Sequence, residues 1–197
     1  MLAALWLCAS GSLTAQTFTT VFSFDGADGS APLGLVQATN GNLYGTTQSA
    51  DGTVFKITPS GALTTLHSFD NTDGRDPNAL IEDTSGTLYG TTASGASTIG
   101  KYHRCTGICG TIFSLSLGLS PFVEVQPGSG KAGATVKILG TDLTGASSVT
   151  FNGTAAKFTV VSSSEITTNV PAGAATGEIQ VVTPKGTLSS KVSFRVP

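Results

Sequence analysis

Five aspartates stand where carboxylates could form a catalytic pair. Asp25 and Asp28 follow Phe24, and Asp70, Asp73 and Asp76 follow Phe69. Glycoside hydrolysis needs two carboxyl groups in different environments. Here Asp25 and Asp70 occupy the same place in two copies of a repeat, as do Asp28 and Asp73. Recurrence once per copy favours a role in the fold, because aspartate side chains accept hydrogen bonds within turns.

The second of these aspartate groups, DNTDGRD at residues 70–76, is also rich in oxygen ligands for calcium. It lacks the alternating acidic order and the distal glutamate of a helix-flanked calcium loop. A turn network is therefore favoured over a calcium site.

A cationic and aromatic cluster lies where the repeat loses its symmetry. Lys101, Tyr102, His103 and Arg104 fall in an insertion of 13 residues, because the offset between matching positions grows from 45 to 58 there. Binding sites are commonly placed on loops of a rigid scaffold. We expect these four residues to contact an extracellular polysaccharide or a surface protein. The alternative is a solvated loop without a ligand.

The same insertion carries two cysteines, Cys105 and Cys109. Two cysteines in an oxidising compartment most simply form a disulfide. A metal site that includes His103 is the alternative, but zinc usually takes a fourth protein ligand or a catalytic water, and a tighter spacing. We therefore expect the disulfide, and neither a metal nor another cofactor.

Length and charge narrow the classes of partner. The chain has 197 residues, of which 11% are charged, and its formal net charge is -2. Nucleic-acid-binding faces are basic, so no nucleic acid is expected as a partner. The many glycines and β-branched residues predict an all-β protein with short strands and tight turns.

The organising feature of the chain is a repeat. The sequence FDG at 24–26 returns as FDN at 69–71, and LYGTT at 43–47 returns as LYGTT at 88–92, both with an offset of 45 residues. In the first copy, strands are expected at 33–39, 42–47, 53–58 and 63–69, with a hairpin at Asn40-Gly41. Strands at 79–82, 88–92 and 111–115 follow in the second copy. Four antiparallel strands in a unit of this length are typical of a propeller blade.

Neither end of the repeat region is complete. Residues 17–24 match 62–69, so they predict a fourth strand without a preceding unit, whereas the second unit has no evident fourth strand. Two units cannot close a propeller, which needs about four. Two explanations stay open: copies of the chain share strands head to tail as a homo-oligomer, or the sequence is a piece of a longer repeat protein.

Three motifs and their second copies resemble the GloVer tandem repeats of secreted bacterial proteins. They are FDG at 24–26, NLYGTT at 42–47 and GTVFKI at 52–57, and the resemblance covers about residues 17–117. It implies a propeller-like fold and an extracellular or surface-anchored location, and it implies no known catalytic activity.

The tyrosine of each copy, Tyr44 and Tyr89, is expected in the core between units, and His67 is expected to be a partly buried bystander.

From residue 121 the repeat is lost and short strands continue to the end of the chain. Seven strands over about 75 residues, including 135–140, 148–151 and 192–196, are typical of an immunoglobulin-like sandwich. The segment is similar to an IPT/TIG domain, on the motifs VKILG at 136–140, VTFNG at 149–153 and VPAGAATG at 170–177. In secreted bacterial proteins that resemblance implies a spacer or accessory module.

The first 16 residues read as a signal peptide, and a buried N-terminal strand is the alternative. An apolar run at 2–9 is followed by small and polar residues, and it is too short to span a bilayer. The expected organisation is a leader at 1–16, two repeats at 17–120 and an IPT/TIG domain at 121–197, with no membrane span in the mature chain. We expect a secreted or surface-associated, non-enzymatic binding or adhesion protein. The alternatives are an accessory module of a carbohydrate-active enzyme (or a weak glycosidase) and a structural spacer.

Overall fold

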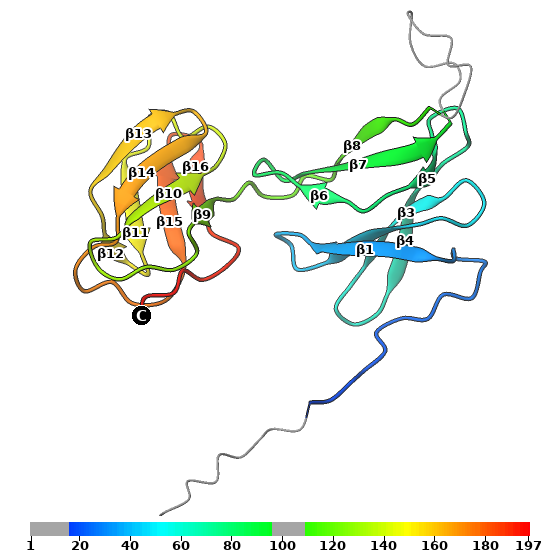
Figure 1. The fold of residues 1–197 in the computed structure, drawn as a ribbon, viewed down its shortest axis with the longest axis horizontal. Coiled ribbons are helices and arrows are strands. Elements are labelled where there is room, and N and C mark those ends of the chain that lie inside the picture. The colour runs from blue at the N-terminus through cyan, green and yellow to red at the C-terminus, as the bar shows by residue number, and fades with distance from the viewer. Residues whose placement is uncertain (1–15, 96–108) are drawn as a thin grey trace, which may run out of the picture.

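The computed structural model describes residues 16–95 and 109–197, and it is all-β within these ranges. Two repeat sheets form one body, and a C-terminal sandwich forms a second body joined to it by a short connection (Figure 1). The predicted fold class, two propeller-like units followed by an immunoglobulin-like sandwich, is confirmed.

The first sheet is a four-stranded antiparallel meander with the order β1-β2-β3-β4. Its strands are β1 (Pro32–Gln37), β2 (Leu43–Thr47), β3 (Thr53–Ile57) and β4 (Leu63–Ser68). The β1–β2 hairpin turns at Asn40-Gly41 as expected, and the Asn40 side chain accepts a hydrogen bond from the Asn42 backbone N–H at 3.0 Å. Gly41 has a φ of 79° there, which glycine adopts without strain.

The second sheet repeats this plan, but two of its four strands lie end to end beside β7, so that it is only three strands wide. Its strands are β5 (Arg75–Pro77), β6 (Ile81–Glu82), β7 (Thr87–Ser94) and β8 (Ile112–Ser116). Both β5 and β6 pair with β7, and together they match β1: Pro77 pairs with Thr92 as Pro32 pairs with Thr47. On the other side of β7 lies β8, which pairs with no further strand in the described part of the chain.

The core of the repeat region lies between the two sheets. Alternation along the strands sends Tyr44 and Val54 toward the second sheet, where they pack with Phe69, Leu80 and Leu88. All five are buried. The predicted core position of Tyr44 is confirmed, and its hydroxyl accepts a hydrogen bond from the Asn40 amide at 2.9 Å. The same prediction is wrong for Tyr89, which is 37% exposed because no further sheet of the described chain packs on its side of β7.

Aromatic rings repeat with the units. Phe69, at the end of the first unit, meets Phe113 of β8 edge-to-face at 5.2 Å and 66°. Phe24 meets Phe55 of β3 with the same separation and angle. Residues 22–24 therefore sit against the first sheet as residues 67–69 sit against the second.

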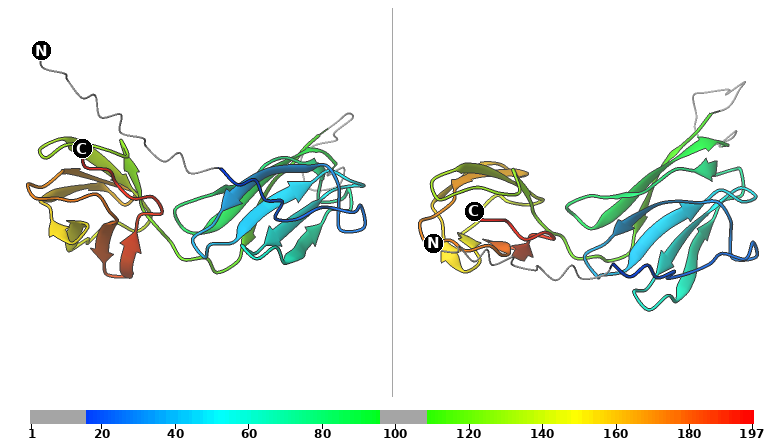
Figure 2. Two further views of the ribbon diagram at one scale, coloured as in Figure 1. Left: turned by 90° about the horizontal axis from the view of Figure 1, so that it is seen from below. Right: turned by 60° about the horizontal axis from the view of Figure 1, so that its bottom comes forward.

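The predicted strand at 17–24 is wrong for the single chain. These residues form no strand, and they run along the outside of the first sheet (Figures 1 and 2). Phe18 is 94% exposed and Val21 is 51% exposed. A strand needs a partner edge for its backbone groups, and the described chain offers none at this place.

The C-terminal module is a sandwich of two four-stranded sheets, with the orders β13-β14-β10-β9 and β12-β11-β15-β16. Its strands are β9 (Glu124–Gln126), β10 (Thr135–Leu139), β11 (Ser148–Phe151), β12 (Thr154–Ala155), β13 (Phe158–Ser162), β14 (Glu165–Asn169), β15 (Ile179–Thr183) and β16 (Gly186–Ser189). Inward side chains of both sheets make one buried core, in which Phe151 and Phe194 meet edge-to-face at 5.3 Å. The strand predicted at 192–196 is replaced by isolated bridges at Phe194 and Arg195.

Candidate functional site

The four predicted binding residues, Lys101, Tyr102, His103 and Arg104, lie outside the described residues, as does Cys105. The structure describes the points where the insertion joins the second sheet. It leaves β7 after Ser94 and returns at Cys109, just before β8. The pairing of Cys105 with Cys109 stays a prediction.

The repeated aspartates form matching turns. An Asp25 carboxylate oxygen accepts the Ala27 N–H at 2.9 Å, and an Asp70 oxygen accepts the Thr72 N–H at 3.0 Å and its hydroxyl at 2.6 Å. The Thr72 hydroxyl, together with that N–H, holds the pKa of Asp70 below its usual value. In each copy the later aspartate accepts the backbone N–H of the earlier one. These carboxylates serve the turns, as the symmetry of the repeat indicates.

His67 makes two specific contacts that the sequence did not predict. Its Nε2 lies 2.7 Å from Asp73 Oδ2, and its ring meets Phe69 edge-to-face at 4.7 Å. The histidine therefore ties β4 to the aspartate turn that follows it. Both side chains are more than a third exposed, so this is a surface contact of small energetic weight.

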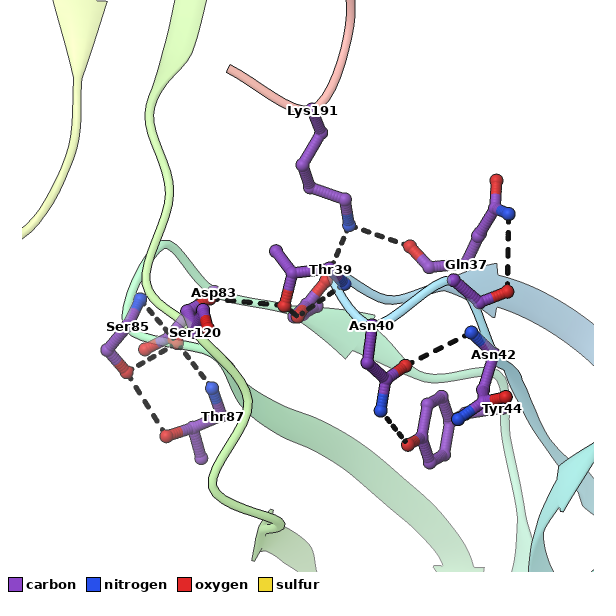
Figure 3. Close-up of polar contacts among 12 residues, drawn as sticks. Gln37, Thr39, Asn40, Asn42, Tyr44, Asp83, Ser85, Thr87, Ser120 and Lys191 are labelled. Carbon is purple, nitrogen blue, oxygen red and sulfur yellow. Dashed lines mark hydrogen bonds and ion pairs between the residues drawn. The ribbon is translucent and has the colours of Figure 1, made fainter. Parts of the chain in front are cut away.

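The most elaborate polar site lies between the repeat sheets and the sandwich (Figure 3). Lys191 of the sandwich forms an ion pair with Glu82 at the end of β6, and its ammonium also donates to the Gln37 carbonyl of β1 at 2.7 Å. The Glu82 side chain is 1% exposed and that of Lys191 is 24% exposed. The Lys191 ammonium also lies 4.7 Å from the centre of the Phe122 ring. One cation thus contacts both repeat sheets and the linker.

Further hydrogen bonds hold the linker at the same junction. The Phe122 N–H donates to the Thr84 carbonyl at 3.0 Å, and the hydroxyls of Thr84 and Thr141 are 2.8 Å apart. The Thr39 hydroxyl donates to the Ser120 carbonyl at 3.1 Å and also approaches Glu82. Because three segments contribute to these bonds, the sandwich is seated on the turns at one end of the sheets.

The turn that carries Thr84 is itself fixed by Asp83. One Asp83 oxygen accepts the Ser85 hydroxyl at 2.6 Å and the backbone N–H of Thr87 at 2.9 Å (Figure 3). Burial raises the pKa of Asp83, but these hydrogen bonds outweigh burial and leave the pKa below its usual value. A charged Asp83 therefore stabilises the surface on which the sandwich sits.

Comparison with known families identifies both modules. The family model described as the Gloeobacter/Verrucomicrobia repeat matches residues 10–157, which is most of the chain. The chain belongs to the Gloeobacter/Verrucomicrobia repeat family. The IPT/TIG domain model matches residues 122–196, so the predicted resemblances of both modules are confirmed. No curated protein matches the chain.

Among solved structures, the chain is similar to a novel fungal alcohol oxidase of the AA5 family in complex with copper. The two are 14% identical, with a TM-score of 0.32, over 84% of this chain and 42% of the oxidase. The chain thus spans less than half the length of that protein.

For this Gloeobacter/Verrucomicrobia repeat protein, the matched families are those of repeats and immunoglobulin-like domains, which indicates a non-catalytic binding or structural module. Within residues 16–95 and 109–197, no group of three or more His, Cys, Asp or Glu side chains is placed to hold a metal ion. The same residues contain no helix long and apolar enough to cross a membrane.

Sequence reasoning missed the junction. The one available signal is a difference between the copies, because Glu82 stands where the first copy has Gln37. Lys191 lies 109 residues further along the chain, so no local pattern links the two.

Proposed function

We propose that the chain is an exported, non-enzymatic binding or adhesion protein that contacts its ligand through the insertion of 13 residues that lies within 93–110. The observation that supports this proposal is that the two ends of β7 have different neighbours. Near its Thr87 end lies the Asp83–Thr87 turn that seats the sandwich, and at its Ser94 end the insertion begins. The eight residues of β7 therefore separate the turn that contacts the sandwich from the insertion.

The mounting end is already occupied by contacts within the chain. Polar side chains at this end already bind the linker or the sandwich: Glu82 pairs with Lys191, Thr84 bonds Thr141, and Thr39 bonds Ser120. The loop end carries no such partner module in the described residues. Rigid sheets that hold a loop away from an attachment module are a common arrangement of binding proteins.

The ligand class follows from the composition of the insertion. Lys101 and Arg104 supply positive charge, and Tyr102 and His103 supply flat rings. Cations and aromatic rings together suit an acidic polysaccharide or an acidic patch on a surface protein. A disulfide between Cys105 and Cys109 would reduce the entropy that the loop loses on binding. The apolar run at 2–9 supports export to the cell exterior.

Binding of the full chain to an array of acidic and neutral glycans tests this function. We expect binding to acidic glycans that a triple variant with Lys101→Ala, Tyr102→Ala and Arg104→Ala loses by at least about tenfold. The matched control is Lys131→Ala with Lys157→Ala, which removes the same number of cations from exposed positions of the sandwich. Equal binding by wild type and triple variant would contradict the proposal.

Two further readouts separate the alternatives. Release of reducing sugar from a bound polysaccharide would identify a glycosidase, and absence of binding to glycans and to surface proteins would identify a spacer. Export is checked by the N-terminus of the secreted chain, and the disulfide by the mass of alkylated protein with and without reductant.

A further inference from the structure

Within the chain, the back of the first repeat sheet packs on the front of the second. The back of the second sheet and the front of the first sheet carry the matching residues, and both are exposed on the outside of the repeat region. Within the chain, Tyr44 and Val54 on the back of the first sheet are 2% and 1% exposed, because the second sheet covers them. The same positions on the back of the second sheet are Tyr89 and Ile112, which are 37% and 81% exposed. Ile81, on the same face, is 66% exposed. The second sheet thus presents an apolar back face that no other segment of the described chain covers.

The first sheet presents the complementary front face. Leu80 on the front of the second sheet is 6% exposed, whereas its counterpart Leu35 on the first sheet is 59% exposed. A groove of about 490 Å³ opens beside Leu35. Its lining is apolar apart from backbone groups and includes Phe22, Phe24, Leu33, Leu43, Phe55 and Ile57. A neighbouring sheet covers this face in the second unit. In the first unit, the described residues supply only the segment around Phe22 and Phe24, which packs beside Phe55 and leaves Leu35 exposed.

The outer edge of β8 also pairs with no further strand within residues 16–95 and 109–197. In the first sheet, β4 covers the corresponding edge of β3, with Val54 opposite His67 and Lys56 opposite Thr64. After β8 the linker turns away, with Leu119 buried against Gly86 and Ser120 bonded to Thr39. An exposed edge of this kind pairs readily with a strand from another chain.

We propose that copies of this chain bind head to tail, with residues 17–24 of one copy added as the fourth strand on β8 of the next. Those residues match β4 in sequence and already hold Phe24 against Phe55 as Phe69 is held against Phe113. The contact between β3 and β4 supplies the register. By it, Ile112 pairs with Phe22 and Ser114 with Thr19.

The same association covers both open faces. The back face of the second sheet of one copy packs on the front face of the first sheet of the other, as the two sheets pack within the chain. Thr46 donates its hydroxyl to the Asn78 carbonyl across the internal interface at 3.1 Å. Its counterpart Thr91 would donate to the Leu33 carbonyl of the next copy. Because the two faces differ, the contact is heterologous and adds copies in one direction.

Two blocked variants test this assembly in the full chain. Ile112→Asp blocks the face that receives the strand, and a double variant with Phe18→Asp and Val21→Asp blocks the strand that is donated. All three positions are more than half exposed, so the single chain should fold as the wild type does. Val192→Asp, at a position of the sandwich that is 78% exposed, is the control.

Sedimentation at about 100 μM protein, where an interface with a Kd near 1 μM is filled, gives the readout. We expect wild type and the control to form oligomers, each blocked variant to be monomeric, and an equal mixture of the two blocked variants to form a dimer. The dimer of the mixture identifies the heterologous contact, since it needs one open face from each variant. A monomeric wild type, blocked variants that still associate, or a mixture that stays monomeric would overturn the proposal.

Discussion

Replacing Lys191 with Met should loosen the sandwich from the repeat sheets. Methionine keeps an apolar side chain of similar length but removes the ammonium, which faces Glu82 and lies over the Phe122 ring. Removing one partner of a fully buried ion pair costs about 3–5 kcal/mol, because the other charge stays buried without compensation. Since Lys191 is 24% exposed, water can replace part of its effect, and we expect a cost of about 2 kcal/mol to the closed junction.

Hydrogen exchange at the Phe122 amide measures this cost directly, because that N–H donates to the Thr84 carbonyl across the junction. A loss of about 2 kcal/mol in the free energy of opening the junction corresponds to exchange that is about 30-fold faster, when the exchange rate follows the equilibrium population of the open junction. Lys137→Met is the control, because Lys137 pairs with Glu165 inside the sandwich and its side chain is 58% exposed. That variant should change Phe122 exchange by less than about threefold.

A second substitution separates charge from packing. Adding Glu82→Gln to Lys191→Met should recover part of the loss, because a neutral amide needs no counter-charge. Unchanged Phe122 exchange in Lys191→Met would refute the reasoning, and so would a double variant with faster exchange than the single one. Either result would mean that Glu82 does not depend on Lys191 for its compensation.

Three further predictions concern stability. Asp83 has a lowered pKa in the folded chain, so its contribution is complete above its ordinary value of 3.8 and is lost as the pH falls through the lower folded value; Asp83→Asn should cost about 1 kcal/mol at pH 7 and flatten the fall in Tm below about pH 4. Gly90→Ala places a Cβ 2.4 Å from the Phe113 ring, so the ring must move, and urea unfolding of the repeat region should show a loss of about 1–3 kcal/mol. Phe151→Ala empties the sandwich core beside Phe194 and should lower the free energy of unfolding by about 3–5 kcal/mol, measured by the same titration.

Local patterns in the sequence were sufficient for most of the fold. The repeat of LYGTT places β2 and β7, and Asn40-Gly41 and Asn152-Gly153 mark hairpins whose residues have the positive φ values that such turns need at Gly41, Asn152 and Gly153. These features depend on residues close together in the chain.

Features that depend on distant partners could not be predicted in this way. Residues 17–24 have the composition of a strand, but a strand exists only where an edge receives it, and the sequence of one chain does not show that edge. The ion pair between Glu82 and Lys191 joins two modules, and each residue alone resembles an ordinary surface charge. The insertion lies outside the described residues, so its four predicted binding residues rest on sequence alone.

The position of the junction has a consequence for how proteins of this design can vary in length. The linker contacts the β1–β2 turn through Thr39, and the sandwich contacts the β6–β7 turn through Thr84, at one end of the two repeat sheets. A new unit inserted ahead of residue 17 would stack on the open front face of the first sheet and would leave both of these turns unchanged. The number of units and the attachment of the C-terminal module are therefore independent variables, which an engineer could set separately.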